Sequence, residues 1–389
     1  MSRIPSSMSV PTPTTSNSGR STVAEQMPMA NLEVADRQEA DRQVADRFDG
    51  RAIRCGVIGV GRMGRHHARV YGSHPSSKLV GVVDSSIDRR EAIADQFNCK
   101  SLDSVEQLLD LGVDAVSIAV PTTHHYRVAE PLLKAGVACL IEKPLAGDVE
   151  TAQRLKELAE ATGSCLMVGH IERFNPVMRA MQRASKAGLE IVPRFIQVVR
   201  VSPMTFRSVD VGVVMDMMIH DLDVVLMLMG GQEPDFIRAA GVAVVTEHED
   251  LCNAWLEFNS PRGRCVANIT ASRLALKTER VTRITGENAY IKIDYGAKQG
   301  TMIRRIANEI QMREVREQLV NGSDLTNLKW NQLVNIEELV VDDEEPIVAE
   351  LSAFLNAVRT GERSPIDADA GFANVRTAQR IVEAIKRTI

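Results

Sequence analysis

A run of glycines after an apolar strand is the feature that most limits what this chain can fold into. The stretch Ile53–Val70 holds Gly59, Gly61 and Gly64 at the spacing G-x-G-x-x-G. Gly59 permits a sharp turn off a strand, Gly61 lets a pyrophosphate approach the backbone, and Gly64 lets the next helix pack closely on the sheet. Phosphates would then face the free N–H groups at the helix N-terminus. Two further residues lie inside the turn, Arg62 and Met63.

A second apolar stretch ends in an acid at the place where a ribose-binding carboxylate is expected. The segment Lys78–Asp84 has the composition of a buried strand. The Asp84 carboxylate would accept hydrogen bonds from both ribose hydroxyls, and its charge would repel a 2′-phosphate. This favours NAD over NADP as the cofactor. Asp84 also suits a helix N-cap or a turn, and the nearby Arg89 and Arg90 keep NADP open.

The composition is that of an ordinary cytoplasmic protein long enough for two domains. The 389 residues are 44% hydrophobic and 25% charged, with a net charge of −5, so nucleic acid and anionic membranes are not expected partners. The six cysteines are scattered without a C-x-x-C pair, which is typical of reduced core residues. The most apolar stretch, Val211–Met229, is interrupted by Asp216, His220 and two further aspartates, so no membrane insertion is expected.

Three segments are predicted. Residues 1–50 are rich in Ser, Thr, Pro and charge, and are expected to be a disordered N-terminal extension. Within this extension an Ala-Asp-Arg repeat recurs every five residues, a period that matches neither a helix face nor a coiled-coil heptad. A start codon placed too far upstream would explain the presence of these residues equally well. Residues 51–170 are predicted to form an NAD-binding Rossmann domain, and residues 171–389 a substrate-binding and oligomerisation α/β domain.

Within residues 53–170, strand and helix signals alternate, which indicates a parallel, doubly wound sheet. One strand, at 114–120, runs into the loop Pro121–His125, and another, at 137–141, runs into Glu142-Lys143-Pro144. Ligands of such sheets bind beyond the carboxyl ends of the strands. The loop and Lys143 are therefore expected at the nicotinamide end of one site.

From residue 171 the pattern indicates an open, largely antiparallel sheet. A helix is expected to about 187, then strands near 194–202, 236–245, 252–259, 264–272, 280–285 and 289–294, with a helix at 211–229 after the first of these strands. Residues 300–340 are polar with weak periodicity and are expected to be partly irregular. Two helices, at 346–359 and 369–387, are expected to close the chain.

Four ordered motifs resemble those of the Gfo/Idh/MocA oxidoreductases. They are the glycine run, the Pro-Thr-x-x-His loop, Glu142-Lys143-Pro144 and a helix with Asp216-x-x-x-His220-x-x-Asp223. The resemblance implies a Rossmann domain, an α/β domain whose open sheet often forms the oligomer interface, and hydride exchange with a sugar or polyol. The residues expected to bind NAD are Gly59, Gly61, Arg62, Met63, Gly64, Asp84, Pro121, Thr122, His125, Glu142 and Lys143.

Within that family, the chain is most similar to the UDP-N-acetylglucosamine 3-dehydrogenases. The resemblance lies in the glycine run and in the segments Gly169–Pro176, Met215–Asp221 and Ala271–Arg273. It implies oxidation of the sugar C3 hydroxyl to a ketone with NAD, ahead of transamination to a 3-amino sugar for lipid A. One departure from many family members is Met218, at a position where they have glycine, and it is expected to narrow the pocket.

Proton and hydride chemistry is expected at Lys143, Asp216 and His220. Asp216 and His220 are four residues apart, so on a helix the carboxylate could orient the imidazole. A histidine titrates near neutrality and can take the hydroxyl proton while hydride leaves the same carbon. Lys143 can hydrogen-bond the reacting oxygen and stabilise its developing charge. A single histidine of this kind is more often structural, but the lysine and the dinucleotide motif favour catalysis.

The other candidates are weaker. His125 matches the loop histidine that lies near the cofactor in the family, whereas His124 is as compatible with a surface position. No third ligand accompanies the histidine pair at a convincing spacing, so no metal is expected. A UDP-sugar also requires cations for its diphosphate. Of the cations expected to face the cleft, Arg173 and Arg273 are the predicted substrate contacts, and the others are Arg200, Arg207 and Lys277.

The sequence is compatible with three functions. The first is oxidation of a nucleotide-sugar, the second is an inositol or free-sugar dehydrogenase of the same family, and the third is a non-catalytic NAD-binding sensor or scaffold. Loss of Lys143 or His220 would mark the third, and both residues are present. A homo-oligomer, dimer or tetramer, through the C-terminal sheet is expected.

Overall fold

We describe the fold from a computed structural model. The structure describes residues 48–186, 191–206, 209–325 and 328–388. It separates residues 1–43 from a compact unit that holds the rest of the chain, 44–389. The predicted N-terminal extension therefore lies almost wholly outside the described residues, and so does Arg207. None of the helices in the described ranges has the length and apolar character needed to cross a membrane.

The first sheet has six parallel strands in the order β3-β2-β1-β4-β5-β6. Its strands are β1 (Ile53–Ile58), β2 (Ser77–Val83), β3 (Lys100–Leu102), β4 (Ala115–Ile118), β5 (Ala138–Glu142) and β6 (Leu166–Gly169). Its helices are α2 (Gly64–Ser73), α3 (Ile87–Phe97), α4 (Val105–Asp110), α5 (His125–Lys134) and α6 (Val149–Thr162). Local signals set the helix ends; α6 begins where the Asp148 side chain accepts a bond from Thr151 N and stops at left-handed Gly163.

The second sheet has eight strands in the order β14-β13-β12-β11-β7-β10-β9-β8. Neighbours are antiparallel except β7 and β10, which are parallel. The strands are β7 (Pro193–Val201), β8 (Phe236–Val242), β9 (Leu251–Ser260), β10 (Gly263–Ser272), β11 (Glu279–Gly286), β12 (Ala289–Asp294), β13 (Gln299–Arg305) and β14 (Val334–Glu338). The predicted fold class, a Rossmann domain plus a largely antiparallel open sheet, is confirmed.

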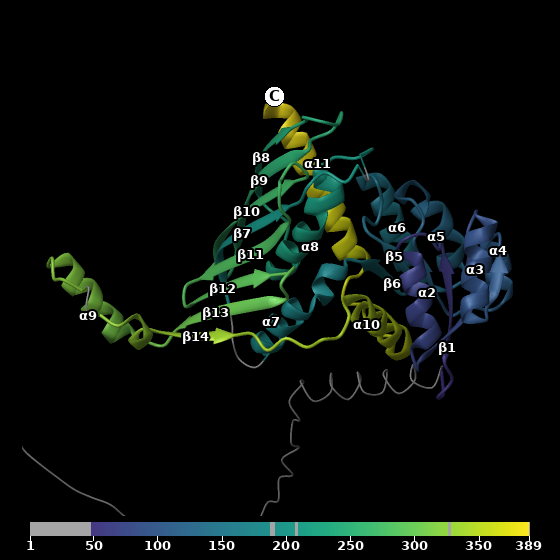
Figure 1. Ribbon diagram of the computed structural model, residues 1–389, viewed down its shortest axis with the longest axis horizontal. Coiled ribbons are helices and arrows are strands. Elements are labelled where there is room, and N and C mark those ends of the chain that lie inside the picture. Colours follow the sequence, from purple (N-terminus) through teal and green to yellow (C-terminus); the bar gives the residue numbers. More distant parts are fainter. Residues whose placement is uncertain (1–47, 187–190, 207–208, 326–327, 389) are drawn as a thin grey trace, which may run out of the picture. The chain divides into compact units, whose positions relative to one another are not determined.

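Helices cover one face of this second sheet. They are α7 (Pro176–Lys186), α8 (Ile219–Leu228) and α11 (Ala368–Thr388), with the short turns η2 (Ile171–Phe174) and η3 (Val214–Met218). Along β9, alternate residues such as Leu256 and Phe258 are fully buried under them. In Figure 1 the opposite face carries no drawn helix.

The stretch 300–340, expected to be partly irregular, holds two strands and a helix separated by irregular segments. The strands β13 and β14 pair with each other and extend the sheet. Between them lie α9 (Glu309–Val320) and the turn η4 (Trp330–Gln332). A reciprocal cap between Asn308 and Gln311 begins α9, although none of its residues is buried. The periodicity is weak because this helix has no buried face.

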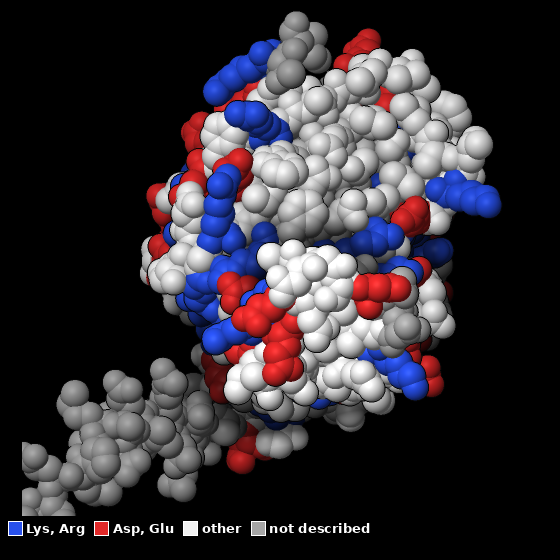
Figure 2. Space-filling view, turned by 90° about the vertical axis from the view of Figure 1, so that its left-hand side faces the viewer, with Lys and Arg blue, Asp and Glu red and all other residues white. Residues whose placement is uncertain are grey.

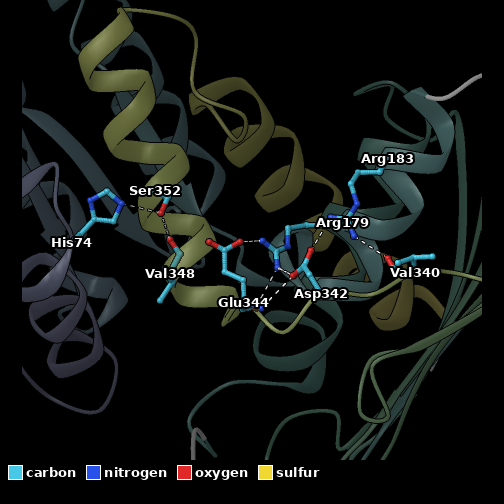
Figure 3. Close-up of polar contacts among 8 residues, drawn as sticks. All are labelled: His74, Arg179, Arg183, Val340, Asp342, Glu344, Val348 and Ser352. Carbon is cyan, nitrogen blue, oxygen red and sulfur yellow. Dashed lines mark hydrogen bonds and ion pairs between the residues drawn. The ribbon is translucent and has the colours of Figure 1, made fainter.

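A strap, residues 340–345, ends in four acidic residues and leads from β14 to α10 (Pro346–Thr360). Figure 3 shows the polar contacts that hold it against α7. Arg179 of α7 binds Asp342 and Glu344, and Arg183 donates to Asp342 at 2.8 Å. Beyond the strap, Ser352 Oγ lies 3.2 Å from His74 Nε2 at the end of α2. Buried residues of α10 belong to the core of the first sheet. A helix assigned by sequence to the second domain thus completes the first.

Candidate active site

The glycine turn has the geometry that a dinucleotide needs. Gly59 has φ +84°, and a Cβ there would meet Ala119 O at 2.7 Å; a Cβ on Gly64 would meet Gly59 O at 1.8 Å. A Cβ on Gly61 would meet nothing within 4 Å, so this glycine faces open space. Met63 caps α2 with no side-chain bond to the helix N–H groups. The three glycines thus match the predicted roles of turn, approach and packing.

Asp84 directly follows β2 and is hydrogen-bonded to the glycine turn. Its Oδ2 accepts from Val60 N at 2.9 Å, and its Oδ1 accepts from Ser86 N and from Arg89 Nη2, both at 2.8 Å. Burial alone would raise the pKa of Asp84, but the Arg89 guanidinium and the backbone donors lower it below its ordinary value. The carboxylate is therefore ionised and suited to ribose hydroxyls.

A pocket of about 370 Å³ joins these parts into a site for the cofactor. Its lining includes Gly59, Gly61, Asp84, Arg89, Pro121, His124 and Arg127. An open glycine, an ionised carboxylate and a helix N-terminus fit a dinucleotide on chemical grounds.

The two adjacent histidines differ from what the sequence led us to expect. His124 lines the pocket. His125 is 1% exposed, and its ring lies 3.1 Å from Val120 O on one side and 3.0 Å from Pro144 O on the other. Burial lowers the pKa of His125, and the backbone carbonyls beside the ring oppose that shift. Its contacts tie the Pro121 loop, in which Thr122 begins a short turn, to the Lys143–Pro144 turn.

Lys143 and Asp216 come together across the two sheets. The ammonium donates to Asp216 O at 2.9 Å and lies 3.7 Å from Asp216 Oδ1. Burial is the main cause that lowers the pKa of Lys143, and the charge of Arg62 lowers it further. The charges of Asp216 and Glu142 oppose this shift. The structure thus brings Lys143 and Asp216, two of the predicted catalytic residues, into contact.

His220 is the second residue of α8, which continues from the π-helical turn η3. Its Nδ1 is buried and has no hydrogen-bond partner. Burial first, then the charges of Lys143 and Arg200, hold the pKa of His220 well below its ordinary value, so the imidazole is neutral. In the described part of the chain no hydrogen bond joins Asp216 to His220, and Asp216 contacts the Lys143 ammonium instead. Met218 is fully buried in the second core, and its expected effect on the pocket stays a prediction.

The predicted phosphate-binding arginines already have protein partners. Arg173 donates to both carboxylate oxygens of Asp223 at 2.6 Å. Arg273 is 4% exposed, lies 3.3 Å from Asp250 and donates to Val211 O at 2.6 Å. Both therefore support the segments around α8, and neither presents a free guanidinium.

A charged cluster beside His220 was partly missed by the sequence analysis. Arg200, 4% exposed, donates to Asp221 through two bonds and to Glu172 at 3.0 Å. Opposite Arg200 in the β7–β11 ladder lies Arg280, which is half-exposed and 4.0 Å from Glu172. Only strand pairing brings Arg280 beside the site, so no local pattern could have identified it.

Comparison with known proteins agrees with this geometry. Residues 53–170 match a family described as oxidoreductases with an NAD-binding Rossmann fold, and residues 205–388 match the C-terminal α/β domain of the same family. A UDP-N-acetylglucosamine 3-dehydrogenase of Acidithiobacillus ferrooxidans is 41% identical over 62% of this chain and 74% of its own. Its solved structure covers 86% of this chain and 98% of that one, with 35% identity and a TM-score of 0.74.

Polyol dehydrogenases are also similar. An inositol 2-dehydrogenase of Rhizobium meliloti is 31% identical over 50% of this chain, which corresponds to 59% of its own length. A levoglucosan dehydrogenase solved with NADH and levoglucosan shares the fold, with a TM-score of 0.72 over 87% of this chain and 98% of its own at 16% identity. The match to both family domains, together with the extended identity to a named dehydrogenase, shows that this chain belongs to the Gfo/Idh/MocA family of NAD-binding oxidoreductases.

Proposed function

We propose that the protein oxidises the C3 hydroxyl of UDP-N-acetylglucosamine to a ketone, ahead of transamination in amino-sugar (lipid A) biosynthesis. The observation that carries the proposal is the contact of the Lys143 ammonium with Asp216, four residues before His220, whose pKa burial and the Lys143 charge hold well below its ordinary value. The similarity to a UDP-N-acetylglucosamine 3-dehydrogenase over 74% of that protein supports the choice of substrate.

In the proposed reaction, His220 accepts the hydroxyl proton through an unprotonated ring nitrogen. Lys143 donates a hydrogen bond to the same oxygen and stabilises its developing negative charge, while Asp216 holds the ammonium in place. Bound NAD supplies the hydride acceptor for the carbon. The products are the ketone, the reduced cofactor and one proton, so charge and electrons balance.

The charges at the site favour an anionic substrate over a free polyol. Asp221 and Glu172 pair with buried Arg200. Arg280 shares Glu172 at the longer distance of 4.0 Å, so its charge is only partly neutralised. A diphosphate would pair with the half-exposed Arg280, whereas inositol has no charge with which to do so. Arg173 and Arg273 remain predicted substrate contacts that would first have to leave their present partners.

We also propose that the chain self-associates through the open face of its second sheet. The outward positions of three adjacent strands are mostly uncharged, apart from the Arg264–Glu257 ion pair near the β9–β10 turn. The uncharged ones are Phe195, Gln197 and Val199 of β7, Leu251, Asn253 and Trp255 of β9, and Val266, Asn268 and Thr270 of β10. Figure 2 shows a broad surface without Lys, Arg, Asp or Glu on this side of the molecule. A Trp255→Glu variant that sediments at the same size as the unchanged protein would count against this interface.

One experiment tests the substrate. The purified protein receives NAD and UDP-N-acetylglucosamine, and NADH formation is followed with a glutamate-dependent aminotransferase present to remove the ketone. Free N-acetylglucosamine, glucose and myo-inositol run in parallel. Turnover of the UDP-sugar alone supports the proposal, and turnover of free myo-inositol would favour the inositol-type alternative. Binding of NAD with no turnover of any of them would favour a sensor or scaffold.

A further inference from the structure

The proposed proton acceptor lies just after an irregular turn of helix. Asp216 N donates to Gly212 O at 3.1 Å, which is the four-residue spacing of an α-helix. Ile219 N donates to Val214 O, five residues back, which is the spacing of a π-helix. Such turns are rare, and they occur mostly as single turns within α-helices, often at functional sites. Because His220 directly follows Ile219, its position depends on how this turn is held.

Contacts with other elements hold the start and the middle of the turn. Glu249, in the loop between β8 and β9, accepts from Val213 N through its backbone carbonyl at 2.9 Å. Its carboxylate accepts from Val214 N at 3.2 Å. Lys143 donates to Asp216 O at 2.9 Å. The backbone of the turn is therefore bonded to groups outside its own helix.

Asn374 of α11 reaches the end of the same turn. Its side chain is 0% exposed, and its Nδ2 donates to Ile219 O at 3.0 Å. The helix α11 packs against both η3 and α8. Ile219 is the residue whose N–H closes the π turn, and its carbonyl is thus tied to a second helix. Asn374 therefore contacts the backbone directly before His220.

The remainder of the Asn374 amide is unpaired. Among the described residues its Oδ1 has no hydrogen-bond partner, and neither has Thr377 Oγ1, one turn further along α11; both atoms are buried. A buried acceptor without a partner costs free energy, and a leucine, which has a similar branched shape, would not incur that cost. The amide is therefore a poor choice for stability alone. The donor to Ile219 O is what an apolar residue cannot supply.

We propose that Asn374 is a positioning residue for His220: by binding the Ile219 carbonyl it fixes the end of the π turn, and with it the direction of the imidazole that takes the substrate proton. Asn374 acts only through the backbone of Ile219, so it is not itself a catalytic residue. The inference rests on the proposed function, in which His220 is the proton acceptor.

The test compares Asn374→Leu with Thr377→Val. The first removes the donor and keeps the branched shape, whereas the second removes an equally buried polar atom that has no bond to α8. With NAD and UDP-N-acetylglucosamine, Asn374→Leu should lower kcat about tenfold, because proton transfer depends on the direction of the ring. KM for both ligands should stay within about twofold, since the groups that bind them are unchanged. Thr377→Val should retain kcat.

Stability separates positioning from a structural role. In denaturant unfolding, neither variant should lose stability, because each removes an unpaired buried polar atom. A residue that only supports the fold would show the reverse, a loss of stability with unchanged kcat. If Asn374→Leu does not fold, Asn374→Ala removes the same donor without adding volume and should show the same loss of kcat.

A second measurement needs no substrate. In protein that carries ¹³C-labelled histidine, the ring resonance of His220 is identified by its absence from His220→Asn. This resonance should shift in Asn374→Leu and stay in place in Thr377→Val. The His74 ring, which lies 3.2 Å from Ser352 Oγ, should keep its resonance in both variants and serves as the internal reference.

The outcomes distinguish this inference from the proposed function. An unchanged kcat or an unchanged His220 resonance in folded Asn374→Leu would overturn the inference. An equal loss of kcat in Thr377→Val would also overturn it, because any change in this part of α11 would then disturb the site. Failure of the unchanged enzyme to oxidise any sugar would instead count against the proposed function.

Discussion

Two polar clusters lie side by side at the start of α8, and they are bonded in opposite ways. Each nitrogen of the Arg200 guanidinium has a carboxylate oxygen of Asp221 or Glu172 within 3.0 Å. Around Lys143 and His220 bonding is incomplete, because His220 Nδ1 has no partner and the ammonium lies 3.7 Å from Asp216 Oδ1. A satisfied cluster holds the fold, whereas an unsatisfied one can still accept a substrate.

The largest effect is expected at the proton acceptor. His220→Asn should lower kcat by about 10²–10⁴-fold, the usual contribution of a general base. In the unchanged enzyme the pKa of His220 is well below its ordinary 6.5, so kcat/KM should stay level as pH falls to that value and decline only below it, when the ring becomes protonated. A decline that begins above pH 7 would contradict this assignment. Steady-state rates from pH 5 to 9 provide the measurement.

Lys143→Met should lower kcat by about 10²–10³-fold through loss of charge stabilisation at the reacting oxygen. NADH binding, followed by fluorescence, should be retained because the glycine turn and Asp84 are unchanged. The matched control is Lys134→Met, which removes an exposed lysine paired with Glu130. Undiminished turnover in Lys143→Met would remove this residue from the mechanism.

A substitution in the fully bonded Arg200 cluster should lower the free energy of unfolding. Arg200→Met leaves Asp221 and Glu172 buried without their main cation, which should cost about 3–5 kcal/mol in the free energy of unfolding. Denaturant unfolding at pH 7 measures the loss. If Lys143→Met proves equally destabilising, the contrast between the two clusters is not real.

The smallest effect concerns the half-exposed Arg280. Arg280→Gln should raise KM for UDP-N-acetylglucosamine about tenfold, which corresponds to about 1.4 kcal/mol. NAD affinity should not change. Arg264→Gln serves as the control, since Arg264 is an exposed arginine paired with Glu257 on the same sheet. An unchanged KM would mean that Arg280 is not a phosphate contact.

Much of the fold was predictable because its signals are local. The glycine turn, the acid that ends β2 and the lysine that follows β5 are each adjacent in sequence to the strand that places them. The strands and the helix within the weakly periodic stretch 300–340 were not predictable, because the pairing of β13 with β14 and the isolated helix α9 depend on partners or caps rather than on an apolar stripe.

The sequence by itself predicted the dinucleotide turn and named Lys143, Asp216 and His220 as candidates, because each follows from chain-local geometry or from an ordered motif. Tertiary structure alone decided which groups these side chains contact. It pairs Asp216 with Lys143, and strand register brings Arg280 opposite Arg200. Packing of α10 into the first core buries Glu350. Burial and cross-strand contact are properties of distant segments brought together, so no local pattern carries them.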